Sequence, residues 1–257
     1  MVYSKFFGVT MTALLLLAGC GGGEPAAEAP KEEAATPEQA YVEVDPATAA
    51  TVTGKVSFTG TPPAAPPINM SAEPQCKGLH STAVTPDVYA VSDGMLGNVF
   101  VWVKSGLQGA FRPPDSAVQL DQKGCIYTPH VLALQTNQNL QVTNSDPMTH
   151  NVHPLPTVNR EWNKSQTPGS PPIDYKFPRQ EIMLPVKCNI HPWMRSYISV
   201  VDHPFFAVTG TDGSFTIKGL PPGTYTIEAV HEELGPKEIS VTVGPSESAT
   251  ADFAFGS

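Results

Sequence analysis

The sequence is poor in cysteine, in charge and in basic residues. Four cysteines occur among 257 residues, charged residues make up 15%, and 15 Lys and Arg face 24 Asp and Glu. Because the net charge is −9, the chain lacks the basic character that a phosphate backbone attracts, and we expect no nucleic-acid partner. No long segment repeats apolar residues at the helical period, and no strict Gly-x-y repeat occurs. These absences exclude helical bundles, coiled coils and collagen.

Proline and glycine are abundant instead, with 27 and 21 residues. Both interrupt helices and favour turns, as at 211–213 and 221–223. Runs of β-branched and alternating residues, typical of strands, occur at 51–58, 98–103, 131–134, 140–142, 197–201, 214–217, 224–228 and 239–243. A doubly wound fold would need helices between its strands. The pattern therefore predicts an all-β protein built from antiparallel sandwiches.

A short apolar segment at the N-terminus is typical of an export signal. Lys5 precedes a leucine-rich run that is too short to span a bilayer as a mature helix, and the run ends at 17–20 with Leu-Ala-Gly-Cys. This ending resembles the lipobox of bacterial lipoproteins. The resemblance implies a signal peptide at 1–19, lipidation of Cys20 and an extracytoplasmic protein anchored to a bacterial membrane, with Gly21 favouring the outer membrane where the cell has one. An ordinary signal peptide is the alternative.

Residues 20–50 are rich in Ala, Pro, Gly and Glu. Seven acids in this stretch face one base, Lys31. Such a segment cannot bury enough apolar surface to offset the entropy lost on ordering. We therefore predict a disordered tether between the lipid anchor and the folded part.

The C-terminal segment 205–257 resembles the second half of a carboxypeptidase-regulatory-like, or carbohydrate-binding-like, sandwich of the prealbumin type. The resemblance rests on a strand–turn–strand pattern at 213–227. The opening Gly-x-Val-x-Phe strand of that family matches 54–58, and its later Val-x-Val strand matches 99–103.

About fifty residues alone are too few for such a sandwich. We therefore expect a discontinuous domain at 51–112 plus 204–257, with a second domain inserted at 115–203. Two sequential domains are the alternative.

The inserted segment contains a loop rich in metal-binding side chains, Cys-Asn-Ile-His-Pro-Trp-Met. It begins at Cys188 and supplies His191 and Met194, and His150 lies upstream. One thiolate, two imidazoles and one thioether are the ligand types of a trigonal copper site with a weak axial sulfur. Pro192 would stiffen the loop by fixing its backbone.

This loop resembles the short ligand loop of amicyanin-type cupredoxins, and 148–153, Met-Thr-His-Asn-Val-His, resembles the segment with their first histidine. The resemblance covers about 117–202 and implies a Greek-key β-sandwich holding one type 1 copper ion. It implies Asn151 as a residue that ties the two ligand segments together by hydrogen bonds. It implies three equatorial ligands and one axial ligand: His150, Cys188, His191 and Met194.

This sequence departs from the amicyanin pattern at Thr149, which replaces a proline, and in a long irregular insertion at 154–180. Zinc is the competing metal, because it also binds Cys and His. The Met in the loop argues against zinc, which does not use Met as a ligand. His153 is an alternative ligand, although a surface position suits it better. A catalytic Cys–His pair lacks an evident orienting acid.

Two cysteines remain after Cys20 and Cys188 are assigned. In an oxidising compartment, Cys76 and Cys125 are expected to form a disulfide. A second metal site that adds His80 and His130 is the alternative. We also expect His203 at the domain junction and His231 in an exposed turn: neither has an assigned role.

The ligand set favours a membrane-anchored blue-copper protein that carries single electrons to a redox protein partner, and not an enzyme. His191 is then expected at the solvent edge, within an apolar docking patch that includes Met148 and Trp193. Loop packing is the alternative role for Trp193. Two other functions stay open: a carbohydrate- or surface-binding module with structural copper or none, and a periplasmic copper-handling protein.

Overall fold

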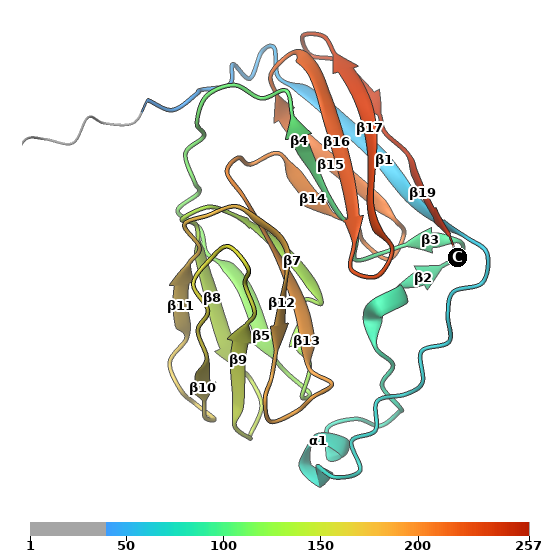
Figure 1. The fold of residues 1–257 in the computed structure, drawn as a ribbon, viewed down its shortest axis with the longest axis vertical. Coiled ribbons are helices and arrows are strands. Elements are labelled where there is room, and N and C mark those ends of the chain that lie inside the picture. The colour runs from blue at the N-terminus through green and yellow to red at the C-terminus, as the bar shows by residue number, and fades with distance from the viewer. Residues whose placement is uncertain (1–39, 257) are drawn as a thin grey trace, which may run out of the picture. The chain divides into compact units, whose positions relative to one another are not determined.

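The computed structural model describes residues 40–256. The expected signal peptide, Cys20 and most of the expected tether lie outside the described residues. The regular structure of the described residues is almost entirely β-strand, as predicted, and the strands form four sheets (Figure 1). The purely antiparallel pairing that was expected is wrong, because several strand pairs are parallel.

The first pair of sheets is formed by residues from both ends of the described chain. One sheet contains β15 (Ser214–Leu220), β1 (Ala50–Thr59), β3 (Met95–Leu96) and β2 (Val91–Ser92), with β18 (Ser248–Thr250) and β19 (Phe253–Gly256) also on β1. The other contains β14 (Phe206–Val208), β4 (Phe100–Ser105), β16 (Gly223–His231) and β17 (Gly235–Val243). We call this pair the scaffold sandwich.

Strand pairing in the scaffold sandwich joins segments that are far apart in the sequence. Gly54 of β1 lies opposite Phe215 of β15, and Val101 of β4 lies opposite Ala229 of β16. A Cβ at Gly54 would lie 2.0 Å from the carbonyl oxygen of Ala251, so only glycine fits at this point of β1. These pairings support the proposed discontinuous domain.

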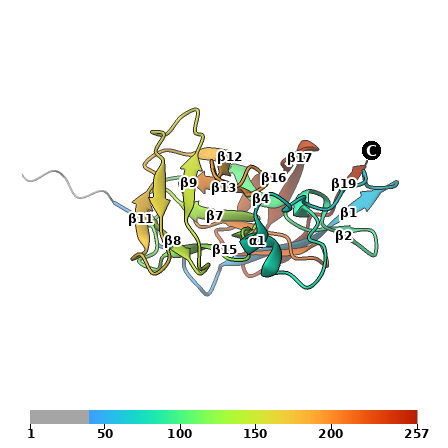
Figure 2. The same cartoon turned by 90° about the horizontal axis from the view of Figure 1, so that it is seen from below.

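The second pair of sheets is formed by the intervening residues. One sheet contains β10 (Lys164–Gln166), β9 (His150–Pro154), β12 (Glu181–Lys187), β13 (Arg195–Val201) and β7 (Val131–Gln135). The other contains β11 (Ile173–Lys176), β8 (Asn139–Asn144), β5 (Val118–Gln122) and β6 (Tyr127–Thr128), with β8 and β11 side by side in both views (Figures 1 and 2). We call this pair the ligand sandwich.

A long irregular segment, residues 60–90, connects β1 to β2, and we call it the strap. It includes the short helix α1 (Pro74–Gly78) and a 3-10 helix (Asp87–Tyr89) (Figure 1). Met70 and Cys76 of the strap are buried in the apolar core of the ligand sandwich. The prediction placed all of 51–112 in the scaffold sandwich. It is wrong for this part of the strap, because the apolar side chains here pack on the inserted domain.

The upstream boundary of the folded part also differs from the prediction. Tyr41 forms a β-bridge with Ala110, and Val44 packs against the scaffold core. Ala50, expected at the end of the tether, is already buried in β1. Apolar contacts thus begin before residue 51 despite the acidic composition of the segment.

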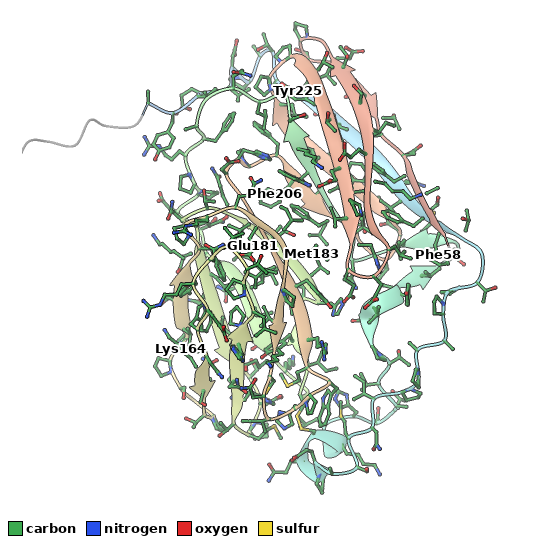
Figure 3. The ribbon with its side chains drawn as sticks, viewed as in Figure 1. Phe58, Lys164, Glu181, Met183, Phe206 and Tyr225 are labelled. Carbon is green, nitrogen blue, oxygen red and sulfur yellow. A yellow bond between two sulfur atoms is a disulfide. The ribbon has the colours of Figure 1, made fainter. Side chains whose placement is uncertain are left out.

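An apolar cluster joins the two sandwiches. Phe100 and Trp102 of β4 are buried together with Val131 and Val201 of the ligand sandwich. Phe206 and Met183 lie at the same contact (Figure 3).

Two histidines outside the metal centre had predicted positions. His203 lies at the junction, where its Nε2 is 2.8 Å from the carbonyl oxygen of Val103. The exposed position expected for His231 is wrong, because its ring stacks on Tyr89 and is 1% exposed. Within residues 40–256, no helix has the length and apolar character needed to cross a membrane.

Candidate metal centre

The predicted ligands come from two neighbouring strand ends and one turn. His150 is the first residue of β9, and Cys188 directly follows β12. His191 and Met194 lie in the turn between β12 and β13. Because β12 pairs with both β9 and β13, the sheet brings these segments together.

Three of the four predicted ligands converge on one point. The Nδ1 atoms of His150 and His191 are 2.9 Å apart, and the Cys188 Sγ lies 3.8 Å from the His191 Nδ1. The three donor atoms lie within 4.8 Å of one another, and all three side chains are buried. Two imidazole nitrogens and one thiol at this spacing fit a copper ion, and the thiol and imidazoles also suit zinc.

Met194 is fully buried beside these side chains. Its backbone N–H donates to the carbonyl of His191 at 2.9 Å, and its carbonyl accepts from the Cys188 N–H at 3.2 Å. These bonds close the turn. Pro192 lies within the turn and is exposed.

Asn151 connects the two ligand segments. Its Oδ1 accepts a hydrogen bond from the Asn189 N–H at 2.7 Å and lies 3.3 Å from the Cys188 Sγ. The side chain is itself held, because its Nδ2 donates to Asn163 Oδ1 at 2.7 Å. Its contacts are those that the resemblance implies.

Asp146 holds the first histidine, a role that the sequence reasoning missed. Its Oδ2 lies 2.8 Å from the His150 Nε2, and the carboxylate also accepts from the backbone N–H groups of Gly124 and Cys125 at 2.6 and 2.7 Å. The bond at Nε2 leaves Nδ1 of His150 free to bind a metal. An acid four residues before a ligand histidine was the available signal.

The thiol and the two imidazoles have shifted pKa values. Burial alone would raise the pKa of Cys188, but hydrogen bonds from His150 and nearby backbone groups outweigh it and lower the pKa. Burial would lower the pKa of His150, but its bonds with Cys188 and Asp146 raise it. Burial, together with the proximity of His150, lowers the pKa of His191. The lowered pKa values of Cys188 and His191 shift both groups toward the forms that bind metals, whereas the raised pKa of His150 shifts that imidazole away from its metal-binding form.

The solvent-edge position expected for His191 is wrong, because the strap covers it. His191 is 3% exposed. On the side away from Cys188, its Nε2 lies 3.5 Å from the Sγ of Cys76 on α1. Cys76 and Cys125 form a disulfide with their Cα atoms 5.6 Å apart, and both are buried. The disulfide therefore fastens the strap beside the imidazole.

The alternative second metal site is not assembled. Its two cysteines are joined to each other. The His80 Nε2 lies 2.7 Å from the Gly124 carbonyl oxygen, and His130 pairs with Glu232.

The predicted docking patch is also partly covered. Met148 and Trp193 are half-buried and pack against the core of the ligand sandwich. The Trp193 Nε1 donates to the Cys125 carbonyl at 3.0 Å, and its ring lies 5.2 Å from that of His191. His153 is not part of the donor group: its Nε2 bonds to Glu161, and its Nδ1 lies 3.0 Å from the Asn189 Oδ1 in the ligand turn.

Comparison with known proteins gives a family match for one part of the chain. Residues 197–256 match the carboxypeptidase regulatory-like domain, as the resemblance of the C-terminal segment implied. The matched region runs from within β13 to β19, so it contains much of the scaffold sandwich. None of the curated proteins matches the chain.

Similar solved structures include a nitrite reductase and two cupredoxin-type proteins. A copper-containing nitrite reductase from Thermus scotoductus SA-01 is 18% identical over 38% of this chain, with a TM-score of 0.31, and the match spans a quarter (25%) of that protein. A purple cupredoxin from Nitrosopumilus maritimus is 18% identical over 32% of this chain and 97% of its own, with a TM-score of 0.28. An oxidised amicyanin variant is 19% identical over 39% of this chain and 97% of its own, with a TM-score of 0.30.

Proposed function

We propose that this protein is an electron carrier with one type 1 copper ion. The proposal rests on one observation: the Nδ1 atoms of His150 and His191 and the Sγ of Cys188 are buried and lie close enough together to bind one ion. A copper ion held there would cycle between its +1 and +2 states and exchange one electron with a redox partner.

The chain's own residues hold this donor set in place. Asp146 fixes the ring of His150, and Asn151 fixes the turn after Cys188. Met194 would supply a fourth, thioether donor, because it closes the same turn and is fully buried. A rigid donor set suits electron transfer, since a site that changes little between two oxidation states needs little reorganisation.

We also propose that lipid on Cys20 anchors the protein to a bacterial membrane, outside the cytoplasm. The lipobox resemblance supports this placement. The segment between Cys20 and the first described residues would then act as the spacer.

A copper-holding role is the second candidate function. It is favoured by the covered state of His191, whose Nε2 contacts Cys76 of the strap, because a buried ligand slows metal release. Nothing in the scaffold sandwich specifically favours glycan binding.

Copper loading followed by visible and EPR spectroscopy tests the main proposal. We expect an intense thiolate-to-copper absorption that disappears in Cys188→Ser, together with reversible one-electron cycling. His150→Asn should also lose the band, whereas the matched control His153→Asn, on the same strand, should keep it. Copper that binds without colour or reversible cycling would contradict electron transfer and leave the holding role.

A further inference from the structure

A cleft of about 420 Å³ lies where the strap meets both sandwiches. Its walls come from three separate parts of the chain. These parts are the strap, the ligand sandwich and the turn that follows β16 in the scaffold sandwich. This volume is in the range of pockets that bind small organic molecules.

Part of the lining is apolar. Ile68 and Val84 of the strap face this space together with Ile126 and Trp193, and all four are half-buried. Such a wall would take the apolar body of a ligand out of water. The two strap residues are also tied together, since the Ile68 N–H donates to the Val84 carbonyl at 2.8 Å.

The rest of the lining carries an excess of negative charge. The Glu232 side chain is only 3% exposed, and its carboxylate pairs with the His130 Nε2. Glu233 and Asp87 add two exposed carboxylates, and Arg195 is the only Lys or Arg among the lining residues. Three acids thus face one guanidinium and one imidazole that is already paired.

Aromatic rings also line the cleft. Tyr197 packs edge-on to His130, with ring centroids 5.8 Å apart. Burial and the neighbouring Glu232 raise the pKa of Tyr197, so its phenol stays protonated. Tyr197 and Trp193 therefore add aromatic rings to the lining, and the negative face of such a ring attracts a cation.

We propose that this cleft binds a small organic cation, an ammonium group on an apolar or aromatic body. The carboxylates and aromatic faces would hold the charge, and the apolar wall would hold the body. The site does not need the metal, although Trp193 places it one side chain away from His191. Binding can therefore be tested apart from the proposed copper function.

Three isosteric probes separate charge from shape in calorimetric titrations of the metal-free, full-length protein. They are 2-phenylethylammonium, neutral 2-phenylethanol and anionic phenylacetate. We expect the ammonium to bind about tenfold more tightly than the alcohol, or better, because one favourable charge contact is enough for that factor. Phenylacetate should bind most weakly. Equal affinity for the three probes, or no binding of the ammonium, would overturn the proposal.

Exposed charges at the rim provide variants that leave the fold intact. Glu233→Gln should weaken ammonium binding about threefold to tenfold, and Arg195→Gln should tighten it by a similar factor. Glu238→Gln, an exposed acid on β17 outside the cleft, is the matched control and should change nothing. If all three variants bind the ammonium with the same affinity, binding occurs elsewhere and the proposed site is refuted.

Discussion

The two sandwiches bury different kinds of side chain. The scaffold core is a continuous cluster of aliphatic and aromatic residues around strands such as β1 and β16. The ligand sandwich also has an apolar core, but it buries a larger set of polar groups, including Gln122, Asp146, His150, Asn151, Gln166 and His191. Burying polar groups is costly unless each finds a partner.

The buried polar groups of the ligand sandwich largely satisfy one another. The Gln122 Nε2 donates to the Gln166 Oε1 at 2.7 Å, and Gln166 lies opposite His150 in the β9–β10 pair. Gln166 in turn donates to the carbonyl oxygens of Val142 and Pro171. The scaffold sandwich therefore stabilises the molecule through apolar burial, while the ligand sandwich uses part of its interior to hold the ligand side chains in place.

The largest loss of stability is expected from truncating a buried side chain in either core. Ile217→Ala in the scaffold and Leu140→Ala in the ligand sandwich should each cost about 2–5 kcal/mol, because both side chains are fully buried. Denaturant melts monitored by tryptophan fluorescence measure this cost. Only Leu140→Ala should also alter the spectrum of the copper-loaded folded protein, and an equal spectral change in Ile217→Ala would argue against separate roles.

Removing the disulfide should have the next largest effect. The bond joins residues 49 apart in the sequence, and its loss in the double variant Cys76→Ala/Cys125→Ala should cost about 2–4 kcal/mol. The freed strap should also uncover His191, so that a chelator removes bound metal faster. Unchanged chelation kinetics would show that the strap does not control access to the site.

Asp146→Asn tests the role of one buried polar group in the ligand sandwich. Loss of the carboxylate at His150 should weaken metal binding about 10–100-fold, since partners of ligand histidines have effects of this size. A competition titration measures the affinity. Asp121→Asn is the control, because Asp121 bonds to Thr143 and Ser145 and not to a ligand.

Glu181 provides a pH-dependent test in the ligand sandwich. Burial would raise its pKa, but hydrogen bonds from Asn159 and the backbone of 157–159 lower it below the usual value. Its contribution is therefore present above the unfolded-state pKa of roughly 4.3 and is lost as the pH falls through the lower folded-state pKa. Glu181→Gln should cost about 1–2 kcal/mol at neutral pH. The free energy of unfolding of the wild type and of Glu181→Gln is measured against pH. A difference between them that stays constant down to acid pH would contradict this account.

The smallest effect is expected at the surface of the scaffold sandwich. Lys104 pairs with both Glu228 and Glu238, but Glu238 is exposed. Exposed ion pairs contribute little, because water and salt screen them. Glu238→Gln should leave the thermal midpoint unchanged within error, whereas Glu228→Gln should lower it, since Glu228 is buried and accepts from the Trp102 Nε1 at 2.8 Å.

Local patterns were sufficient for much of the fold. Alternation and turn residues predicted β1, β4, β15, β16 and β17 within a few residues. They failed in the strap, because its contacts with the ligand sandwich depend on Met70 and Cys76 fitting a surface that is formed far downstream. The seven-residue loop from Cys188 to Met194 likewise predicted ligand types without predicting what surrounds them.

The sequence by itself determined the all-β class, the kinds of donor atom and the spacing of three of the donors within one turn. It could do so because strand periodicity and a tight turn are local properties of the chain. Only the tertiary structure decided that Asp146 fixes His150 and that Cys76, 115 residues upstream of His191, covers it. Such contacts depend on how separate segments fill a common interior, and no local pattern encodes which surfaces will meet.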